Sequence, residues 1–372
     1  MLNIQNNNDT LNDELKENLK NINTKYLVMS LREIMSMFDE NEIKINPIYQ
    51  RGFRWTQTDK TYLIESLILN FPIPPIFVYQ REDGIWELVD GLQRISTVLE
   101  FFGKLPEEMI NKNNRLEKLS AGKILTKLEG LSPEEFISTH KDLALKLKKY
   151  AIHVVIIDAI ENEINNGKFE YEVFRRLNTY GARLSKQEIR NVTLALRDEE
   201  LYEIMDNFTK EDIFNKVFTF GGKKLDERKD LEVILQFYML YNIDFYQEKL
   251  NKVYDLYDLL DDISIEVQKE DMKKVLDIMR VYLQDIYEIV GEENYSFQPY
   301  DEKKKKFSQG YQNHIFEAVT LLYFKNKENV TLDYLKCIES YTEWRNSLEI
   351  ANVKGHKRVL KVLDYVDGLL DD

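Results

Sequence analysis

The sequence is poor in cysteine and histidine, two residue types on which disulfide scaffolds and many metal sites depend. Cysteine occurs once among 372 residues, as Cys337. An internal disulfide framework is therefore excluded, and a cysteine-rich metal site is disfavoured. The histidines stand apart from one another at His140, His153, His314 and His356. Nothing in their spacing indicates a histidine-based metal centre.

Long apolar runs and excess basic charge are missing as well. No segment offers the roughly 18 uncharged apolar residues that a membrane helix needs, and the start, MLNIQNNNDT, lacks the basic and apolar regions of a secretion signal. We therefore expect a cytoplasmic protein without a membrane partner. The formal net charge of -14 disfavours a protein that coats nucleic acid non-specifically, because neutralising phosphates requires a basic surface.

The residues that are present predict an α+β protein. With 43% hydrophobic and 31% charged residues, the chain is typical of globular proteins and long enough for two domains. Strands are expected at 26–29, 76–79, 86–89 and 151–158, and Thr58 or Asp59 is expected to cap a helix. The domains are predicted as an Asn-rich leader at 1–24, a mixed α/β domain at 25–197 and an all-helical region at 198–372.

The stretch LVDGLQR at 88–94 places polar residues between an apolar strand and an apolar helix. A helix starting near Leu92 would present backbone N–H groups there, and Gly91 would let an anion approach without a Cβ in the way. Asp90 could hold a metal ion or activate a water, Gln93 could contact a base or sugar edge, and Arg94 would favour an anionic partner. The alternative is structural, with Asp90 capping the helix and Arg94 in an ion pair.

A second stretch, INPIYQRGFRW at 45–55, interleaves aromatic rings with guanidinium groups. Its candidate ligand-binding residues are Tyr49, Gln50, Arg51, Arg54 and Trp55. Arginine offers planar donors that match phosphate, and the aromatic rings offer stacking faces for a base. The alternative is that the rings belong to a core and the arginines to its rim.

The third stretch, FRRLNTYGARLSKQEIR at 174–190, has a turn at Gly181 between two helical patterns. Arg175 and Asn178 could reach toward a shared pocket. A helix-turn-helix corner, with Ser185 as N-cap and Glu188 completing a capping box, explains much of the same pattern.

Together these stretches resemble the N-terminal domain of GmrSD-type restriction endonucleases, a family placed with ParB and sulfiredoxin-like folds. The matching motifs are Pro47-Ile-Tyr49-Gln50-Arg51 with Arg54-Trp55, Phe71-Pro-Ile-Pro-Pro75, Asp90-Gly91-Leu92-Gln93-Arg94, and Leu177-Asn178-Thr-Tyr-Gly181 with Leu184-Ser185 and Glu188-Ile-Arg190. By motif the resemblance covers roughly residues 25–197, and it continues weakly through the helical tail.

The resemblance implies a ParB/sulfiredoxin-like nucleotide-binding domain, because the family's Asp-Gly-Gln-Gln-Arg signature is associated with nucleotide binding and hydrolysis. Carried over, it makes Asp90, Gln93 and Arg94 catalytic, with Asp90 also the metal ligand. The implied nucleotide-binding residues are Tyr49, Gln50, Arg51, Arg54, Gly91 and Asn178. Leu92 departs from the family pattern, which usually has glutamine there.

Many members of the family also carry an HNH-type nuclease domain, which needs a histidine base with metal-binding neighbours. The four isolated histidines give no sign of one. We therefore expect an NTP-binding and NTP-hydrolysing protein of a prokaryotic DNA restriction or anti-phage defence system, with Mg²⁺ as cofactor. The expected partners are a nucleoside triphosphate, DNA, and a separate nuclease or defence protein. Two other functions stay open: a modified-DNA sensor without significant hydrolysis, and a ParB-like DNA nickase.

Overall fold

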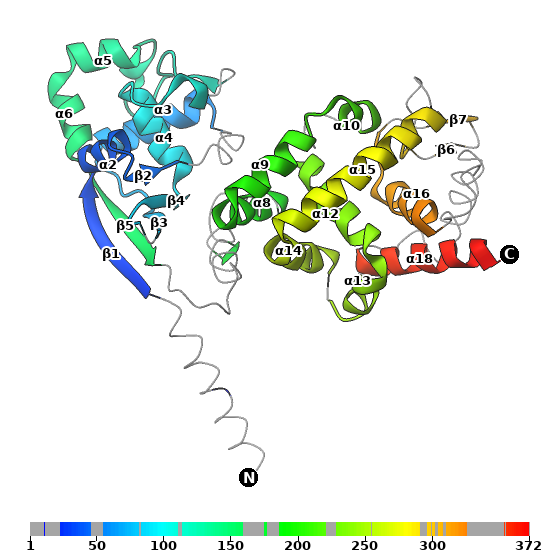
Figure 1. Cartoon of the computed structure of the whole chain (residues 1–372). Coiled ribbons are helices and arrows are strands. Elements are labelled where there is room, and N and C mark those ends of the chain that lie inside the picture. Colours follow the sequence, from blue (N-terminus) through cyan, green and yellow to red (C-terminus); the bar gives the residue numbers. More distant parts are fainter. Residues whose placement is uncertain are drawn as a thin grey trace, which may run out of the picture. The chain divides into compact units, whose positions relative to one another are not determined.

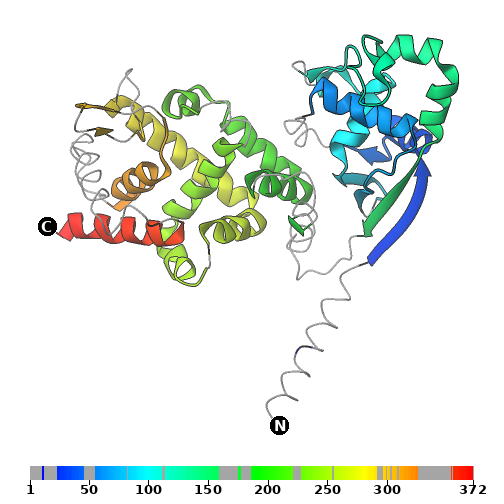
Figure 2. The same cartoon turned by 180° about the vertical axis from the view of Figure 1, so that it is seen from behind.

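The computed structural model describes residues 11, 23–45, 55–81, 83–110, 114–158, 175–176, 186–220, 228–253, 255–290, 296–298, 300–301, 304–307, 310–325, 353 and 355–371. The chain forms two compact units, Met1–Asn165 and Asn166–Asp372. The strand-containing unit runs from blue to green and the helical unit from green to red (Figures 1 and 2). The domain limits of 25–197 and 198–372 stay a prediction.

The first unit is built on a mixed sheet with the strand order β1-β5-β3-β4-β2. The strands are β1 (Asn23–Ser30), β2 (Ile43–Lys44), β3 (Ile76–Gln80), β4 (Trp86–Asp90) and β5 (Ala151–Asp158). β3 and β4 form an antiparallel hairpin, β5 runs parallel to β3 and antiparallel to β1, and β2 runs parallel to β4. The last strand in sequence therefore fills the place between β1 and β3.

Helices gather on one side of this sheet, as Figure 1 shows. They are α2 (Leu31–Asp39), α3 (Gln57–Ile68), α4 (Leu92–Phe101), α5 (Pro133–Thr139) and α6 (Lys141–Lys149), with short 3₁₀ turns at Glu107–Met109 and Thr126–Leu128. Capping boxes begin two of them, Ser30 with Glu33 at α2 and Thr56 with Asp59 at α3. The N-cap of α3 is thus Thr56 rather than Thr58 or Asp59, and Asp59 serves as the third helical residue of the box.

The core of this unit lies between the helices and one face of the sheet. Ile76 and Val78 of β3 and Ile152, Val154 and Ile156 of β5 belong to it. These positions alternate along each strand, so their side chains point to the same face of the sheet. Val155 and Ile157, between and beyond them on β5, are buried as well. The residues between them point to the opposite face, and that face carries no helix of the first unit among the described elements.

The second unit is helical. Its helices are α8 (Lys186–Arg197), α9 (Glu199–Phe208), α10 (Asp212–Val217), α12 (Lys229–Tyr241), α13 (Ile243–Leu250), α14 (Leu256–Glu266), α15 (Lys269–Val290), α16 (Asn313–Lys325) and α18 (His356–Asp371). A two-stranded ribbon pairs β6 (Tyr300–Asp301) with β7 (Lys306–Phe307). α12 and α16 are buried on almost every side, so they form the centre around which the other helices pack.

Aromatic rings fill much of this helical core. Phe218 stacks on Phe297 with centroids 5.2 Å apart, and Phe297 meets Phe316 edge-on at 5.1 Å. Offset and edge-on pairs of this kind add to the free energy of apolar burial.

The predicted α+β class is confirmed, with a mixed sheet and helices in the first unit and helices in the second. The ParB/sulfiredoxin-like assignment stays an expectation drawn from the resemblance. Among the helices that the structure describes, none is both long and apolar enough to cross a membrane.

Candidate functional site

The junction of β4 and α4 brings Asp90, Gly91 and Arg94 together. The pairing of β3 with β4 shifts at this point, since Phe77 lies opposite Asp90 while Val78 lies opposite Leu88. Gly91 then forms the N-cap of α4 with a φ of 100°, in the left-handed region. A glycine has no side chain with which to cap the helix, so the first turn of α4 is left to backbone N–H groups, the arrangement that favours an anion.

Packing against β3 also requires a glycine at position 91. A Cβ at this position would lie 2.5 Å from Cγ2 of Ile76, closer than two carbon atoms approach. The positive φ adds to the strain that any other residue would meet. Glycine is therefore required by the strand beneath it, whether or not a ligand approaches from above.

Arg94 is held in place by three contacts. Its Nη2 donates to Oδ2 of Asp90 at 2.7 Å, and its Nη1 donates to the carbonyl oxygens of Pro74 and Pro75, the latter at 2.9 Å. The side chain is 12% exposed. Arg94 therefore holds the proline-rich segment Phe71-Pro-Ile-Pro-Pro75 against the start of α4.

The two charges differ in their access to solvent. The Asp90 side chain is 32% exposed, so water and ions reach its carboxylate. Burial lowers the pKa of the Arg94 guanidinium, and the charge of Asp90 opposes part of that shift. An arginine nevertheless keeps its proton at physiological pH. The pair places a fixed positive charge and a reachable negative charge at the N-terminus of one helix.

The structure brings together three of the residues that the sequence analysis assigned to the site, Asp90, Gly91 and Arg94, while Gln93 lies half-buried in the same turn. Asp90 is not the N-cap, which is Gly91, but the Asp90–Arg94 ion pair of the structural alternative is present. The predicted residues Tyr49, Gln50, Arg51, Arg54 and Asn178 lie outside the described residues. Trp55 packs against the core of the first unit, and Arg175 is exposed.

A metal ion would rely on Asp90 at this site. Within the described part of the chain, no group of three or more histidine, cysteine, aspartate or glutamate residues is placed to hold a metal ion. Mg²⁺ fits such a site, because it is commonly held by one or two carboxylates together with phosphate oxygens and waters.

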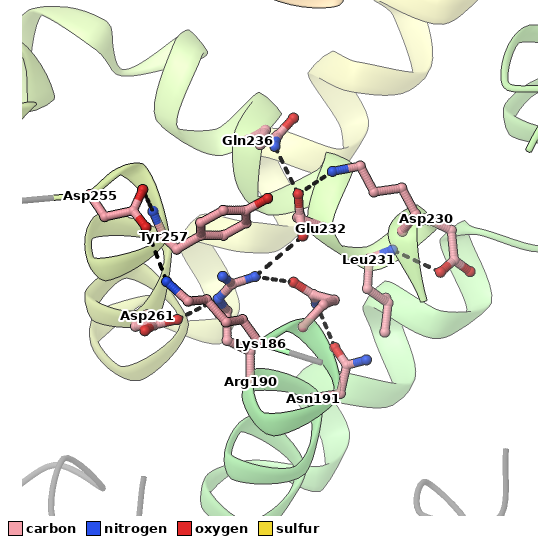
Figure 3. Close-up of polar contacts among 12 residues, drawn as sticks. Lys186, Arg190, Asn191, Asp230, Leu231, Glu232, Gln236, Asp255, Tyr257 and Asp261 are labelled. Carbon is pink, nitrogen blue, oxygen red and sulfur yellow. Dashed lines mark hydrogen bonds and ion pairs between the residues drawn. The ribbon is translucent and has the colours of Figure 1, made fainter. Parts of the chain in front are cut away.

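The helical unit contains a second polar cluster around Arg190, which Figure 3 shows. Arg190 is 1% exposed, and its Nε donates to Oδ1 of Asp261 at 2.5 Å. Its Nη1 donates to Gln187 and lies 3.6 Å from Oε2 of Glu232. The guanidinium carbon lies 5.3 Å from the centroid of the Tyr257 ring. One buried cation thus connects α8, α12 and α14.

Other polar groups extend the network, although Nη2 of Arg190 and Oε1 of Gln236 are buried without a hydrogen-bond partner among the described residues. Glu232 accepts from Lys229 and, at 3.1 Å, from Nε2 of Gln236. Gln187 donates to Oδ1 of Asn191 at 2.7 Å. Buried ion pairs with additional hydrogen bonds avoid the full cost of desolvation. We interpret the cluster as a structural element that fixes the packing of three helices.

Sequence reasoning assigned Arg190 to a motif but did not identify its partners. The available signal was an acidic residue inside an apolar helix, as in DLEVILQFYMLY for Glu232. Asp261 lies 71 residues from Arg190, and no local pattern pairs residues over that separation.

Residues 34–195 match the family described as the GmrSD restriction endonuclease, N-terminal domain. Comparisons with curated proteins and with solved structures found no match. The match begins in α2 and ends in α8, so it includes Asp90, Arg94 and Arg190 but neither Glu232 nor Asp261. The resemblance drawn from the sequence motifs is confirmed, and it relates the chain to restriction systems. Over residues 34–195 this chain is therefore similar to the GmrSD restriction endonuclease N-terminal domain family.

Proposed function

We propose that the protein binds a nucleoside triphosphate at the N-terminus of α4 and hydrolyses it, as part of a prokaryotic DNA restriction or anti-phage defence system. The observation that carries the proposal is the placement of a solvent-reachable Asp90 beside the uncapped first turn of α4, with the cation of Arg94 fixed 2.7 Å away. Backbone N–H groups and a cation suit phosphate. The carboxylate suits a metal ion or an attacking water.

Each residue has a distinct part in this proposal. The N–H groups of the first turn bind phosphate oxygens, and Arg94 contributes positive charge while orienting Asp90. Asp90 would hold Mg²⁺, which when bound neutralises phosphate charge, and it orients the water that attacks the terminal phosphorus. Water adds to that phosphorus as the bond to the bridging oxygen breaks, giving a nucleoside diphosphate and inorganic phosphate. Such catalysis consists of positioning and charge stabilisation.

The net charge of -14 bears on the remaining partners. A protein with this charge does not bind DNA through its overall field. We therefore propose that DNA and a separate nuclease or defence protein bind to local surfaces of the protein.

A nucleotide panel tests the proposal. The four common ribonucleoside triphosphates are added with Mg²⁺, with and without supercoiled plasmid, and melting temperature, phosphate release and plasmid integrity are measured. We expect at least one nucleotide at about a hundredfold its dissociation constant to stabilise the fold by about 2.7 kcal/mol. Phosphate release should stop when a chelator removes the metal.

Other outcomes would contradict the proposal in recognisable ways. DNA affinity that falls steeply with salt, without any nucleotide effect, points to a DNA sensor. Plasmid nicking that needs Mg²⁺ but no nucleotide points to a nickase. Neither result is compatible with NTP hydrolysis as the activity of this site.

A further inference from the structure

The sheet face opposite the helices carries a row of residues that leads away from Asp90. Across the strands, Asp90 of β4 is paired with Phe77 of β3, Phe77 with Val155 of β5, and Val155 with Tyr26 of β1. Paired residues in adjacent strands point to the same face of a sheet. These four side chains therefore form one transverse row, here called the aromatic row.

The aromatic row lies outside the core of the first unit. The core takes the alternate residues of β3 and β5, and Phe77, Val155 and Tyr26 are not among them. Tyr26 is 76% exposed, and its neighbour on the same face, Val28, is 61% exposed. Phe77 is half-buried and Val155 buried. The row thus runs from Asp90 through the half-buried ring of Phe77 and the buried Val155 to the exposed ring of Tyr26.

Its dimensions suit a nucleotide bound at Asp90. Adjacent strands lie about 4.8 Å apart, so Phe77 is one strand and Tyr26 three strands, or roughly 14 Å, from Asp90. A ligand whose phosphates occupy the first turn of α4 can extend its sugar and base along this row. Tyr79, two residues beyond Phe77 on β3, is half-buried and adds a third aromatic ring to the same face.

The charges beside the row favour a neutral base over a polyanionic strand. Arg81 is paired with Glu87 at 3.2 Å, and Arg94 with Asp90 at 2.7 Å. A single-stranded nucleic acid requires a track of cations for its backbone in addition to stacking rings. Among the described residues beside the row, Arg81 and Arg94 already have acidic partners, whereas aromatic faces stack with any base.

We infer that the aromatic row binds the nucleobase of the nucleoside triphosphate, with Phe77 as the ring next to the phosphate site and Tyr26 as the outer ring. This inference rests on the proposed function. It adds that a substantial share of the affinity comes from the base. Because stacking does not read hydrogen-bonding edges, several bases should bind with similar affinity.

The experiment compares a nucleoside triphosphate with inorganic tripolyphosphate, both titrated calorimetrically into the full chain with Mg²⁺. We expect the nucleotide to bind at least about tenfold more tightly than tripolyphosphate, the contribution of one stacked base. Tyr26→Ala and Phe77→Leu should each lower nucleotide affinity severalfold and leave tripolyphosphate affinity unchanged. Tyr26→Phe keeps the ring and should bind like the parent.

Two controls separate stacking from other effects. Tyr26 is exposed, so its substitution leaves the core intact even if Phe77→Leu disturbs the fold. Phe245→Ala removes another exposed ring, 65% accessible and in α13 of the helical unit, and should change neither affinity.

The inference is overturned if both ligands bind the parent equally, or if Tyr26→Ala and Phe77→Leu bind the nucleotide like the parent. In either case phosphate binding, and with it the proposed function, would stand. If neither ligand binds, both proposals fall. Binding of an oligo(dT) strand that depends on Tyr26, without nucleotide binding, would assign the aromatic row to nucleic acid instead.

Discussion

The Arg94 guanidinium fixes the Asp90 carboxylate from one helical turn away, with Nη2 donating to Oδ2 at 2.7 Å while Nη1 donates to the Pro75 carbonyl at 2.9 Å. The Arg94 side chain thereby connects the proline-rich segment 71–75 to the Asp90 carboxylate at the start of α4. Arg94 is therefore structural and functional at once. Its two roles can be separated experimentally.

We predict that Arg94→Ala lowers both stability and nucleotide affinity. The substitution leaves two proline carbonyls and a carboxylate without their donor, so unfolding should become easier by about 1–3 kcal/mol. Arg94→Lys keeps the positive charge but lacks the planar set of guanidinium donors. It should therefore restore nucleotide affinity more than the free energy of unfolding. Chemical denaturation and calorimetric titration measure the two effects. Arg115→Ala, which removes an exposed arginine paired with Glu107, is the control; an Arg94→Ala protein as stable as this control would contradict the bracing role.

Gly91→Ala should destabilise the protein more than Gly103→Ala. Both glycines have a positive φ, 100° and 65°, so both substitutions strain the backbone by about 1 kcal/mol or more. Only Gly91 would also place its Cβ 2.5 Å from Ile76, whereas nothing lies within 4 Å of a Cβ at Gly103. Thermal unfolding of the two variants gives the comparison. Equal losses of melting temperature in the two variants would show that the Ile76 side chain can move aside without destabilising the fold.

Arg190→Ala should be among the most damaging single substitutions in the helical unit. It would leave Asp261 as a buried charge without its cation, while Glu232 would keep only Lys229, a change that costs about 3–5 kcal/mol. The exposed pair of Lys186 with Asp255 offers a contrast, because Lys186→Ala should cost no more than about 1 kcal/mol. Urea denaturation measures both. A small loss for Arg190→Ala would mean that the network does not hold the helices together.

Glu65 should make stability depend on pH in the acid range. Burial disfavours its charge, but backbone N–H groups of Leu125, Ile124 and Lys123 donate to its carboxylate at 2.6, 2.8 and 3.1 Å, and the pKa falls below its ordinary value of 4.5. A carboxylate whose pKa is lower in the folded state stabilises the fold above the unfolded pKa. That contribution is lost as the pH falls through the folded pKa.

The matched variant for this prediction is Glu65→Gln. The parent should be more stable than the variant above about pH 5, and the difference should shrink steadily as the pH is lowered below 4.5. Denaturation curves across this range provide the measurement. A difference that is constant from neutral to acid pH would show that the charge of Glu65 contributes nothing.

Local features of the first unit were predictable from the sequence because their causes are local. The strands expected at 76–79 and 86–89 are present as β3 and β4, and the Asp-Gly step predicted the start of α4 at Leu92. The ion pair of the structural alternative for Arg94 was also correct, because Asp90 at the end of β4 lies next to the first turn of α4, which carries Arg94. The cap of α3 was misplaced by two or three residues because several threonine and aspartate side chains compete there.

Long-range contacts could not be predicted in the same way. The insertion of β5 between β1 and β3 depends on pairing residues that are far apart in the sequence, such as Tyr26 with Val155 and Phe77 with Val155. The aromatic row and the partners of Arg190 both follow from such pairings. Apolar periodicity identifies which residues are buried but not which buried residues meet.

The division of labour between Asp90 and the phosphate-binding groups is tested most directly by Asp90→Asn. Asp90 is proposed to act on the water or the metal, so the variant should bind the nucleotide within about threefold of the parent while phosphate release falls about 100-fold or more. Asp83→Asn, in the exposed turn between β3 and β4, is the matched control and should hydrolyse like the parent. Parental turnover by folded Asp90→Asn protein would contradict the account and leave the Asp90–Arg94 pair as a structural brace alone.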